Sequence, residues 1–193
     1  VLPCVAFASL IQHYTDVDHI KEFKPGEKYV FFEFPHGIFP MGQFLSATLI
    51  SQIWGEETMI CGTGANIIFL FPGMRQLMSW LGTRPVNRES FSQILSAGHH
   101  CAVIPGGIAE MYLASEKEEV VFIRRRRNTV KLAIQNGTHI CPAYFFGNTS
   151  ILHFVGSEGN DSFLSIISRK MKASVMFFYG RLGIPIPVRH PIR

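Results

Sequence analysis

Short apolar runs alternate along this chain with longer stretches that have helical spacing. Residues 29–34 read Tyr-Val-Phe-Phe-Glu-Phe, follow a Lys-Pro-Gly-Glu turn and run directly into Pro-His-Gly. A short aromatic and β-branched run between turn residues is typical of a buried strand. The same reasoning predicts further strands at residues 101–104, 120–123 and 140–146.

Between these runs, four stretches predict helices, at residues 42–54, 74–81, 91–97 and 129–135. Ser90 is placed to cap the third helix and Gly98 to end it, and an Asn-Gly pair follows the fourth. A basic helical stretch surrounds Arg169, Lys170 and Lys172. Strands that alternate with helices indicate an α/β domain with a central, mostly parallel sheet flanked by helices.

The composition excludes several classes of protein. Of the 193 residues, 47% are hydrophobic and 17% charged, which excludes a disordered chain, and four isolated cysteines favour reduced thiols over a disulfide scaffold. No repeat or linker divides the sequence, so we expect one domain over residues 1–193, truncated at both ends. The apolar residues 1–11 are shorter than the ~20 that span a bilayer. They are a candidate remnant of a membrane segment, with one buried helix or strand as the alternative.

The positive charge of the chain is concentrated in one block. The formal net charge is +4, and four consecutive arginines at 124–127 follow the acidic residues Glu116, Glu118 and Glu119. A single block favours a local anion site or a membrane-facing patch over a nucleic-acid surface, for which no recognition motif is present. The 17 phenylalanines indicate contact with an apolar partner.

His36 is the first residue with candidate chemistry, because it directly follows a predicted strand. In open α/β sheets the carboxyl ends of the strands face the ligand crevice. Histidine is also the side chain whose ordinary pKa suits proton abstraction near neutral pH. The alternative interpretation is that His36 only forms hydrogen bonds within a turn.

A second loop, Pro-Gly-Gly-Ile-Ala-Glu at 105–110, follows another predicted strand. Its glycines allow close approach of the backbone to a ligand, and Glu110 is placed to orient an imidazole or to accept a hydrogen bond from a substrate hydroxyl. The alternative is a plain strand-to-helix turn with Glu110 in the first helical turn. The neighbouring residues His99, His100 and Cys101 do not predict a metal site, since adjacent strand side chains point to opposite faces.

Five segments resemble, in the same order, the motifs of the type-2 diacylglycerol O-acyltransferase family, which also contains monoacylglycerol and wax-alcohol acyltransferases. They are Phe-Pro-His-Gly at 34–37, Arg-Pro-Val-Asn-Arg-Glu at 84–89, Pro-Gly-Gly-Ile-Ala-Glu at 105–110, the basic block 124–137 and Pro-Ala-Tyr-Phe-Phe-Gly-Asn at 142–148. Phe34 stands where the family has the first histidine, so only His36 can carry that motif's catalytic role. Met41 occupies the place of the aspartate in the His-x4-Asp pattern of the wider glycerolipid acyltransferase group, which leaves Glu110 as the candidate acidic partner.

The resemblance implies a glycerolipid-acyltransferase-like fold and an acyl-CoA-dependent O-acyltransferase that converts diacylglycerol to triacylglycerol. His36 would act as the general base, Glu110 as its partner, and the backbone of Gly106 and Gly107 would stabilise the oxyanion. Acyl-CoA is a co-substrate, and the chemistry requires no metal or redox cofactor. The implied location is the cytosolic face of the endoplasmic reticulum membrane or the lipid droplet, with no nucleic-acid partner.

Binding of the CoA phosphates is expected from arginine and lysine side chains. The expected substrate-binding residues are Gly37, Arg84, Arg88, Pro105, Gly106, Gly107, Arg124, Arg126, Arg127 and Lys131. Surface ion pairing, or a solvated or membrane-apposed basic face, is the alternative for the arginines. The apolar stretch 67–71 near Trp80 is expected to line an acyl channel or to rest in the bilayer interface, with a plain hydrophobic core as the alternative. The alternative functions are the same chemistry on monoacylglycerol, a long-chain alcohol or a lysophospholipid, or a catalytically inactive lipid-binding family member.

Overall fold

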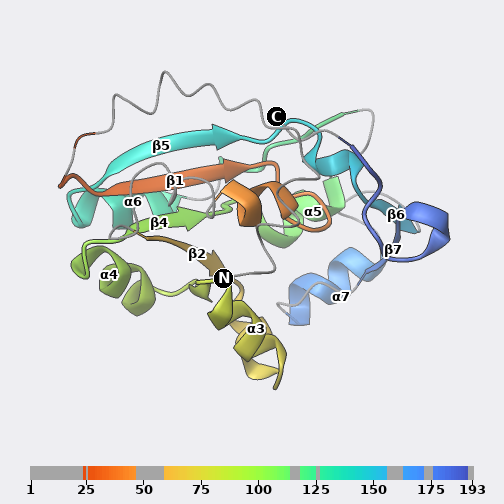
Figure 1. Cartoon of the computed structure of the whole chain (residues 1–193), viewed down its shortest axis with the longest axis horizontal. Helices are drawn as coiled ribbons and strands as arrows, with labels where there is room; N and C mark the ends of the chain where they lie inside the picture. The colour runs from red at the N-terminus through yellow and green to blue at the C-terminus, as the bar shows by residue number, and fades with distance from the viewer. Residues whose placement is uncertain are drawn as a thin grey trace.

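A five-stranded parallel sheet forms the centre of the computed structural model, which describes residues 24, 26–46, 59–113, 118–124, 127–155, 163–171 and 176–190 (Figure 1). Its strands stand in the order β3-β2-β4-β1-β5. They are β1 (Tyr29–Phe34), β2 (Ile60–Gly64), β3 (Arg84–Pro85), β4 (His100–Val103) and β5 (His139–Tyr144). This arrangement confirms the α/β fold class expected from the sequence.

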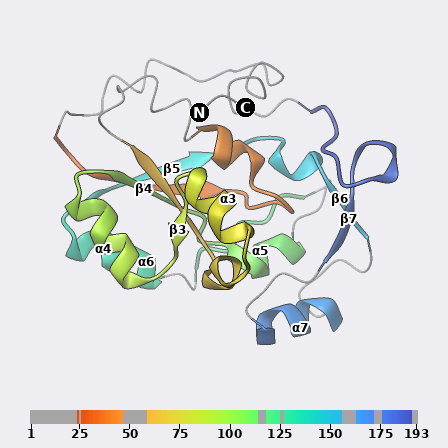
Figure 2. The same ribbon diagram turned by 60° about the horizontal axis from the view of Figure 1, so that its bottom comes forward.

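Strand β1 is buried along its whole length because it lies between two neighbours. Val30 is in register with Cys101 of β4 and with Ile140 of β5. Helices α4 (Arg88–Ser96) and α6 (Arg127–Gln135) lie side by side against the sheet in both views (Figures 1 and 2). They close the main core cluster, whose buried members include Val30, Phe32, Phe34, Phe91, Leu95, Cys101, Val103 and Ala133.

The remaining elements lie at the carboxyl ends of the strands and beyond them. Residues 41–46 are helical, and α3 (Met74–Trp80), α5 (Gly107–Leu113) and α7 (Phe163–Met171) follow along the chain. A second, antiparallel sheet pairs β6 (His153–Val155) with β7 (Phe177–Tyr179). Three short 3-10 helices complete the description, η2 (Asn66–Leu70), η3 (Asn148–Ser150) and η4 (Arg181–Gly183).

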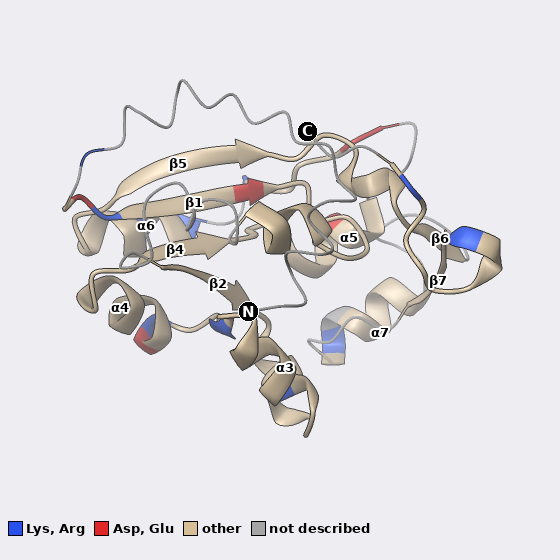
Figure 3. Ribbon diagram, in the orientation of Figure 1, with Lys and Arg blue, Asp and Glu red and all other residues tan. Residues whose placement is uncertain are grey.

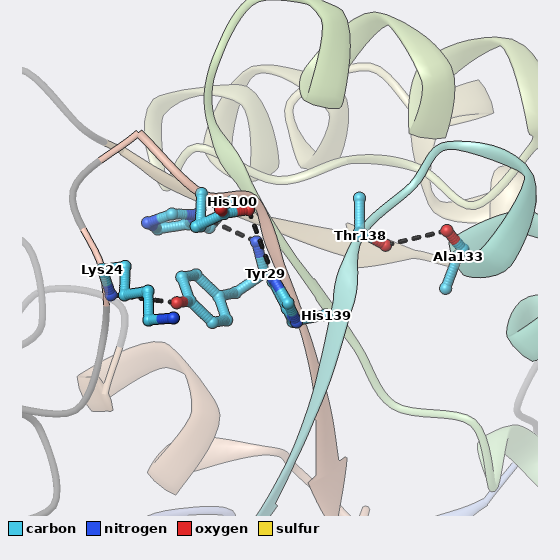
Figure 4. Close-up of polar contacts among 7 residues, drawn as sticks. Lys24, Tyr29, His100, Ala133, Thr138 and His139 are labelled. Atoms are coloured by element: carbon cyan, nitrogen blue, oxygen red, sulfur yellow. Dashed lines mark hydrogen bonds and ion pairs between the residues drawn. The ribbon is translucent and has the colours of Figure 1, made fainter.

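Aromatic packing holds the opposite, amino end of the sheet together (Figure 4). The ring of Tyr29 stacks on that of His139 with centroids 5.3 Å apart, and the backbone N–H of Tyr29 donates to His100 Nδ1 at 3.3 Å. Thr138 Oγ1 donates to the carbonyl of Ala133 at 3.0 Å and so fixes the connection from α6 to β5. This end is therefore a packed edge, and the predicted site loops lie at the other one.

Most of the predicted elements are confirmed, with shifts of one to three residues at their ends. The cap of α4 differs from the prediction: Asn87 Oδ1 accepts the N–H of Ser90 at 2.8 Å, so Asn87 caps the helix and Ser90 lies inside it. The predicted strand at 120–123 is wrong. Within the described segment 118–124 no strand forms, and the N–H of Phe122 donates to a carboxylate instead of to a neighbouring strand.

Some predictions fall on residues that the structure does not describe. These are the apolar residues 1–11, residues 47–54 of the first predicted helix, and Lys172 of the basic stretch. Among the described helices, none combines the length and the apolar character needed to cross a bilayer.

Candidate active site

The turn that carries His36 follows β1 and lies next to the loop that follows β4. The adjacency comes from the sheet, because β1 and β4 are paired in parallel and their carboxyl ends meet at one edge. Glu110, in the first turn of α5, accepts a hydrogen bond from the backbone N–H of His36 at 2.5 Å between N and Oε1. The structure thus brings together the two residues that the sequence singled out for catalysis.

The half-buried imidazole of His36 has a defined tautomer. Its Nδ1 lies 2.9 Å from the carbonyl oxygen of Gly37. Because a carbonyl can only accept, Nδ1 carries the hydrogen and Nε2 carries the lone pair. Burial of the ring lowers the pKa of His36 below its usual value of 6.5, and this effect outweighs the hydrogen bonds to the backbone of Gly37 and of His36 itself, which raise the pKa. The ring is therefore a neutral base at neutral pH, with Nε2 as its accepting atom.

Glu110 is completely buried and holds two separate stretches of backbone. Besides the N–H of His36, its carboxylate accepts the N–H of Phe122 at 3.0 Å through Oε2. It also lies directly against Gly106, whose lack of a side chain leaves room for it. The hydrogen bonds described for Glu110 thus fix the backbone of the histidine turn. That Glu110 orients the imidazole itself stays a prediction.

Asn148, which the sequence analysis did not single out, is the third polar group at the turn. It is fully buried at the start of η3, and its amide contacts the backbone of Pro35, His36 and Gly42. Gln43 adds a hydrogen bond from Nε2 to the carbonyl of Pro35 at 2.8 Å. The available sequence signal was the position of Asn148 at the end of the motif 142–148, which gave no hint of its target.

A buried carboxyl group lies just upstream of the site. Glu33 of β1 is 4% exposed, and Ser46 Oγ lies 3.2 Å from its Oε1. Burial raises the pKa of Glu33 from 4.5 to about 8, and the hydrogen bond from Ser46 opposes this only in part. Glu33 is consequently neutral at pH 7 and adds no negative charge next to the histidine turn.

Hydrogen bonds tie the segment 118–124 to the end of β5 and to η3. Tyr144 Oη donates to Glu119 Oε2 at 2.6 Å, and Thr149 Oγ1 donates to Glu119 Oε1 at 2.8 Å. Partial burial raises the pKa of Tyr144 to about 12, and the hydrogen bond to Glu119 adds to this. Together with the bond from Phe122 to Glu110, these contacts hold the segment next to the loops that follow β4 and β5.

The two glycines after β4 have different surroundings. Gly106 and its neighbour Pro105 are both buried, and Gly106 lies directly against Glu110. Gly107 is partly exposed and opens α5 with a φ of +55°. Gly37, in the facing turn, also has a positive φ of +61°. Backbone amides of Gly106 and Gly107 as oxyanion donors remain a prediction.

The predicted phosphate-binding residues do not form one cluster in the described part of the chain (Figure 3). Arg84 is exposed on β3, at the strand ends, while Arg88 donates from Nη2 to Gln135 Oε1 at 2.8 Å and so joins α4 to α6. Arg124 is exposed at the end of the segment 118–124, and Arg127 and Lys131 are exposed on α6. Arg126 lies outside the described residues. Within the described ranges, no three His, Cys, Asp or Glu side chains come close enough to hold a metal ion.

Comparison with known proteins identifies the family. The family model "Diacylglycerol acyltransferase" matches residues 8–193. The chain belongs to this family. No solved structure matches the chain. The family membership agrees with the order of motifs around the site, from the His36 turn to Asn148.

Individual relatives of this diacylglycerol acyltransferase family member are moderately similar. Human diacylglycerol O-acyltransferase 2-like protein 6 is 29% identical over 68% of this chain and 41% of the relative. Diacylglycerol O-acyltransferase 2 of Danio rerio is 29% identical over 79% of the chain and 44% of the relative. Human acyl-CoA wax alcohol acyltransferase 2 is 30% identical over 77% of the chain and 48% of the relative. In each case the match spans less than half the length of the relative.

Proposed function

We propose that this chain carries the catalytic centre of an acyl-CoA-dependent O-acyltransferase that acts on a lipid alcohol, with diacylglycerol as the acceptor and triacylglycerol as the product. The observation that carries the proposal is His36: a neutral imidazole whose Nδ1–H is engaged by the Gly37 carbonyl. Its Nε2 is thus the atom that accepts a proton, at the strand ends where α/β folds bind ligands. The family membership of the chain and the names of its relatives support the acyl-transfer chemistry.

The reaction follows from the properties of this base. Nε2 of His36 takes the hydroxyl proton as the acceptor oxygen attacks the thioester carbonyl of acyl-CoA, and a C–O bond forms. When the tetrahedral intermediate collapses, the C–S bond breaks and the proton on Nε2 passes to the departing CoA thiolate. General-base assistance of this kind contributes typically ~10²–10⁴-fold. We assign stabilisation of the oxyanion to the backbone N–H groups of Gly106 and Gly107.

The surroundings of the site suit a substrate with a charged and an apolar part. The exposed guanidinium groups of Arg84 and Arg124 are our candidates for the CoA phosphates, with Arg127 and Lys131 on α6 as further ones. Exposed apolar side chains from η2, α3 and the turn between them, among them Leu70, Phe71 and Trp80, suit an acyl chain or a lipid surface. On this basis we propose that the protein works at the cytosolic face of the endoplasmic reticulum membrane or on lipid droplets.

The test is a CoA-release assay on the intact protein in membranes, with labelled acyl-CoA as the donor. Diacylglycerol, monoacylglycerol and a long-chain alcohol are supplied in parallel, and the labelled product is identified. We expect release with diacylglycerol and its loss in His36→Ala, while His139→Ala, which removes an exposed imidazole at the opposite end of the sheet, retains activity. Faster turnover of another acceptor would reassign the substrate. Binding of lipid without any CoA release would support an inactive lipid-binding family member.

A further inference from the structure

The amide of Asn148 reaches the histidine turn from a distant part of the chain. Its Nδ2 donates to the carbonyl oxygens of Pro35 at 3.2 Å and of His36 at 3.1 Å, and its Oδ1 accepts the N–H of Gly42 at 3.0 Å. Asn148 and His36 are 112 residues apart in sequence. These bonds therefore do not belong to a local turn or helix cap. The fully buried amide binds the backbone of a distant segment instead.

The neighbouring contacts show how completely this turn is held. Glu110 accepts the N–H of His36, and Gln43 donates to the carbonyl of Pro35. The imidazole itself donates from Nδ1 to the carbonyl of Gly37. Asn148 supplies the hydrogen bond to the carbonyl of His36. An amide is the side-chain group that donates two hydrogen bonds and accepts others at one point, which neither a carboxylate nor a hydroxyl can do.

Gly37 is fitted to the same contact. A Cβ at position 37 would lie 3.0 Å from Asn148 Nδ2 and 3.1 Å from the carbonyl oxygen of Asn148, and the φ of +61° is unfavourable for other residues. The carbonyl of Gly37 in turn sets the direction of the imidazole through Nδ1. Asn148, the turn carbonyls and the ring thus form one connected chain of contacts.

We propose that Asn148 is a positioning residue for His36, acting through the backbone of residues 35–37. The proposal rests on the proposed function, in which Nε2 of His36 takes the acceptor proton. Because the amide fixes the two peptide groups that precede the Gly37 carbonyl, its loss lets that carbonyl and the bonded ring rotate. Displacement of a catalytic group by about 1 Å can cost ~10²-fold in rate.

The experiment compares three variants of the intact protein. Asn148→Ala removes all three hydrogen bonds, whereas Asn148→Asp keeps an acceptor for the N–H of Gly42 but donates nothing to Pro35 and His36. Asn136→Ala is the matched control, since Asn136 Nδ2 also donates to a backbone carbonyl, that of Leu132 at 2.8 Å, but at the end of α6. Release of CoA is measured between pH 5 and 8 and normalised to the folded protein recovered by size exclusion in detergent.

We expect kcat/KM to fall about 10- to 100-fold in both Asn148 variants and to stay near wild type in Asn136→Ala. In Asn148→Ala the acid limb of the pH profile should also move to higher pH, because a loosened ring is better solvated and burial no longer lowers its pKa to the same extent. A purely structural role would reduce only the amount of folded enzyme and leave this limb in place. That result, full activity in Asn148→Asp, or failure of both Asn148 variants to fold would each overturn the proposal.

Failure of the proposed function gives a different pattern. If His36→Ala still releases CoA, the assignment of the base is wrong, and the proposal for Asn148 falls with it. If His36→Ala is inactive but Asn148→Ala retains the wild-type rate and acid limb, the function stands and only the positioning role is refuted.

Discussion

The carboxylate of Glu110 fills the space that a side chain on Gly106 would need: a Cβ at position 106 would overlap the Oε2 and the carboxyl carbon of Glu110. That carboxylate is the group that accepts the N–H of His36 and the N–H of Phe122. The glycine after β4 therefore has a packing role at the site, whatever its amide contributes to the reaction.

Gly106→Ala is expected to displace the Glu110 carboxylate and to lower kcat by at least about 100-fold, since the turn loses its anchor. It should also lower the unfolding temperature, because each buried N–H left unpaired costs about 1–3 kcal/mol. The measurements are CoA release and thermal unfolding in detergent. Gly62→Ala in β2 is the control, where the added Cβ would meet Thr83 Oγ1 at an ordinary 3.4 Å.

The same pair can be tested for coupling. If the damage in Gly106→Ala runs through the carboxylate, adding this change to Glu110→Ala should cost little more than Glu110→Ala alone. Fully additive losses would show that Gly106 acts independently of Glu110, for instance through its own amide.

The pH dependence of the reaction should report the buried imidazole. An ordinary histidine is half protonated at pH 6.5, but burial lowers the pKa of His36. The neutral base is therefore the major form at pH 6.5, and the midpoint of the acid limb of kcat/KM for acyl transfer should lie below pH 6.5. Initial rates between pH 5 and 8, with enzyme returned to pH 7.5 to check reversibility, measure the limb. A reversible midpoint above pH 6.5 would contradict a buried neutral base.

The two arginines of the motif 84–89 should behave differently. Arg84 is exposed on β3 near the carboxyl ends of the strands, whereas the guanidinium of Arg88 is bonded to Gln135 of α6. We expect Arg84→Ala to raise the KM for acyl-CoA about tenfold with little change in kcat, as for a contact made equally in the ground and transition states. Arg88→Ala should leave KM unchanged.

A CoA analogue that lacks the 3′-phosphate sharpens this test. If Arg84 binds that phosphate, wild type and Arg84→Ala should have similar KM values for the acyl-dephospho-CoA. Equal KM values for acyl-CoA itself in wild type and Arg84→Ala would remove Arg84 from the binding site.

The sequence predicted the frame of the site better than its internal contacts. Apolar runs bounded by turn residues identified β1, β4 and β5, and the parallel pairing of β1 with β4 then placed the loops of His36 and Glu110 at one edge. Strand β2 was missed because Ile-Cys-Gly-Thr-Gly holds two glycines, which weaken the strand signal. The run 120–123 has the composition of a strand, but its Phe122 amide is taken by Glu110.

The polar contacts of the site lay beyond sequence reasoning for a physical reason. Glu110 and Asn148 bind backbone groups. Every residue offers a C=O and every residue except proline an N–H, so the sequence does not reveal which backbone group is the partner. Only the positions of the loops after β1, β4 and β5 decide that Glu110 meets the N–H of His36 and that Asn148 meets its carbonyl. The residue types indicated the chemistry, and the loop geometry determined which backbone atoms Glu110 and Asn148 bind.

The buried carboxyl of Glu33 should make stability fall as the pH rises. Its pKa is about 8 in the folded protein but near 4.5 when the chain unfolds, so the folded state holds an extra proton between these values. The stability contributed by the neutral carboxyl is complete below pH 4.5 and is lost as the pH rises through 8. At pH 7 the loss is on the order of 3 kcal/mol.

Glu33→Gln keeps a neutral group of the same shape that can donate to Ser46 Oγ, and we expect it to remove this loss. Its unfolding temperature in detergent should exceed that of wild type at pH 8, and the difference should shrink steadily toward pH 5. Glu89→Gln, which removes an exposed carboxyl on α4, should show no such trend. A constant difference across this range would mean that Glu33 is already ionised in the fold, because only a carboxyl that gains its proton on folding makes the gap depend on pH.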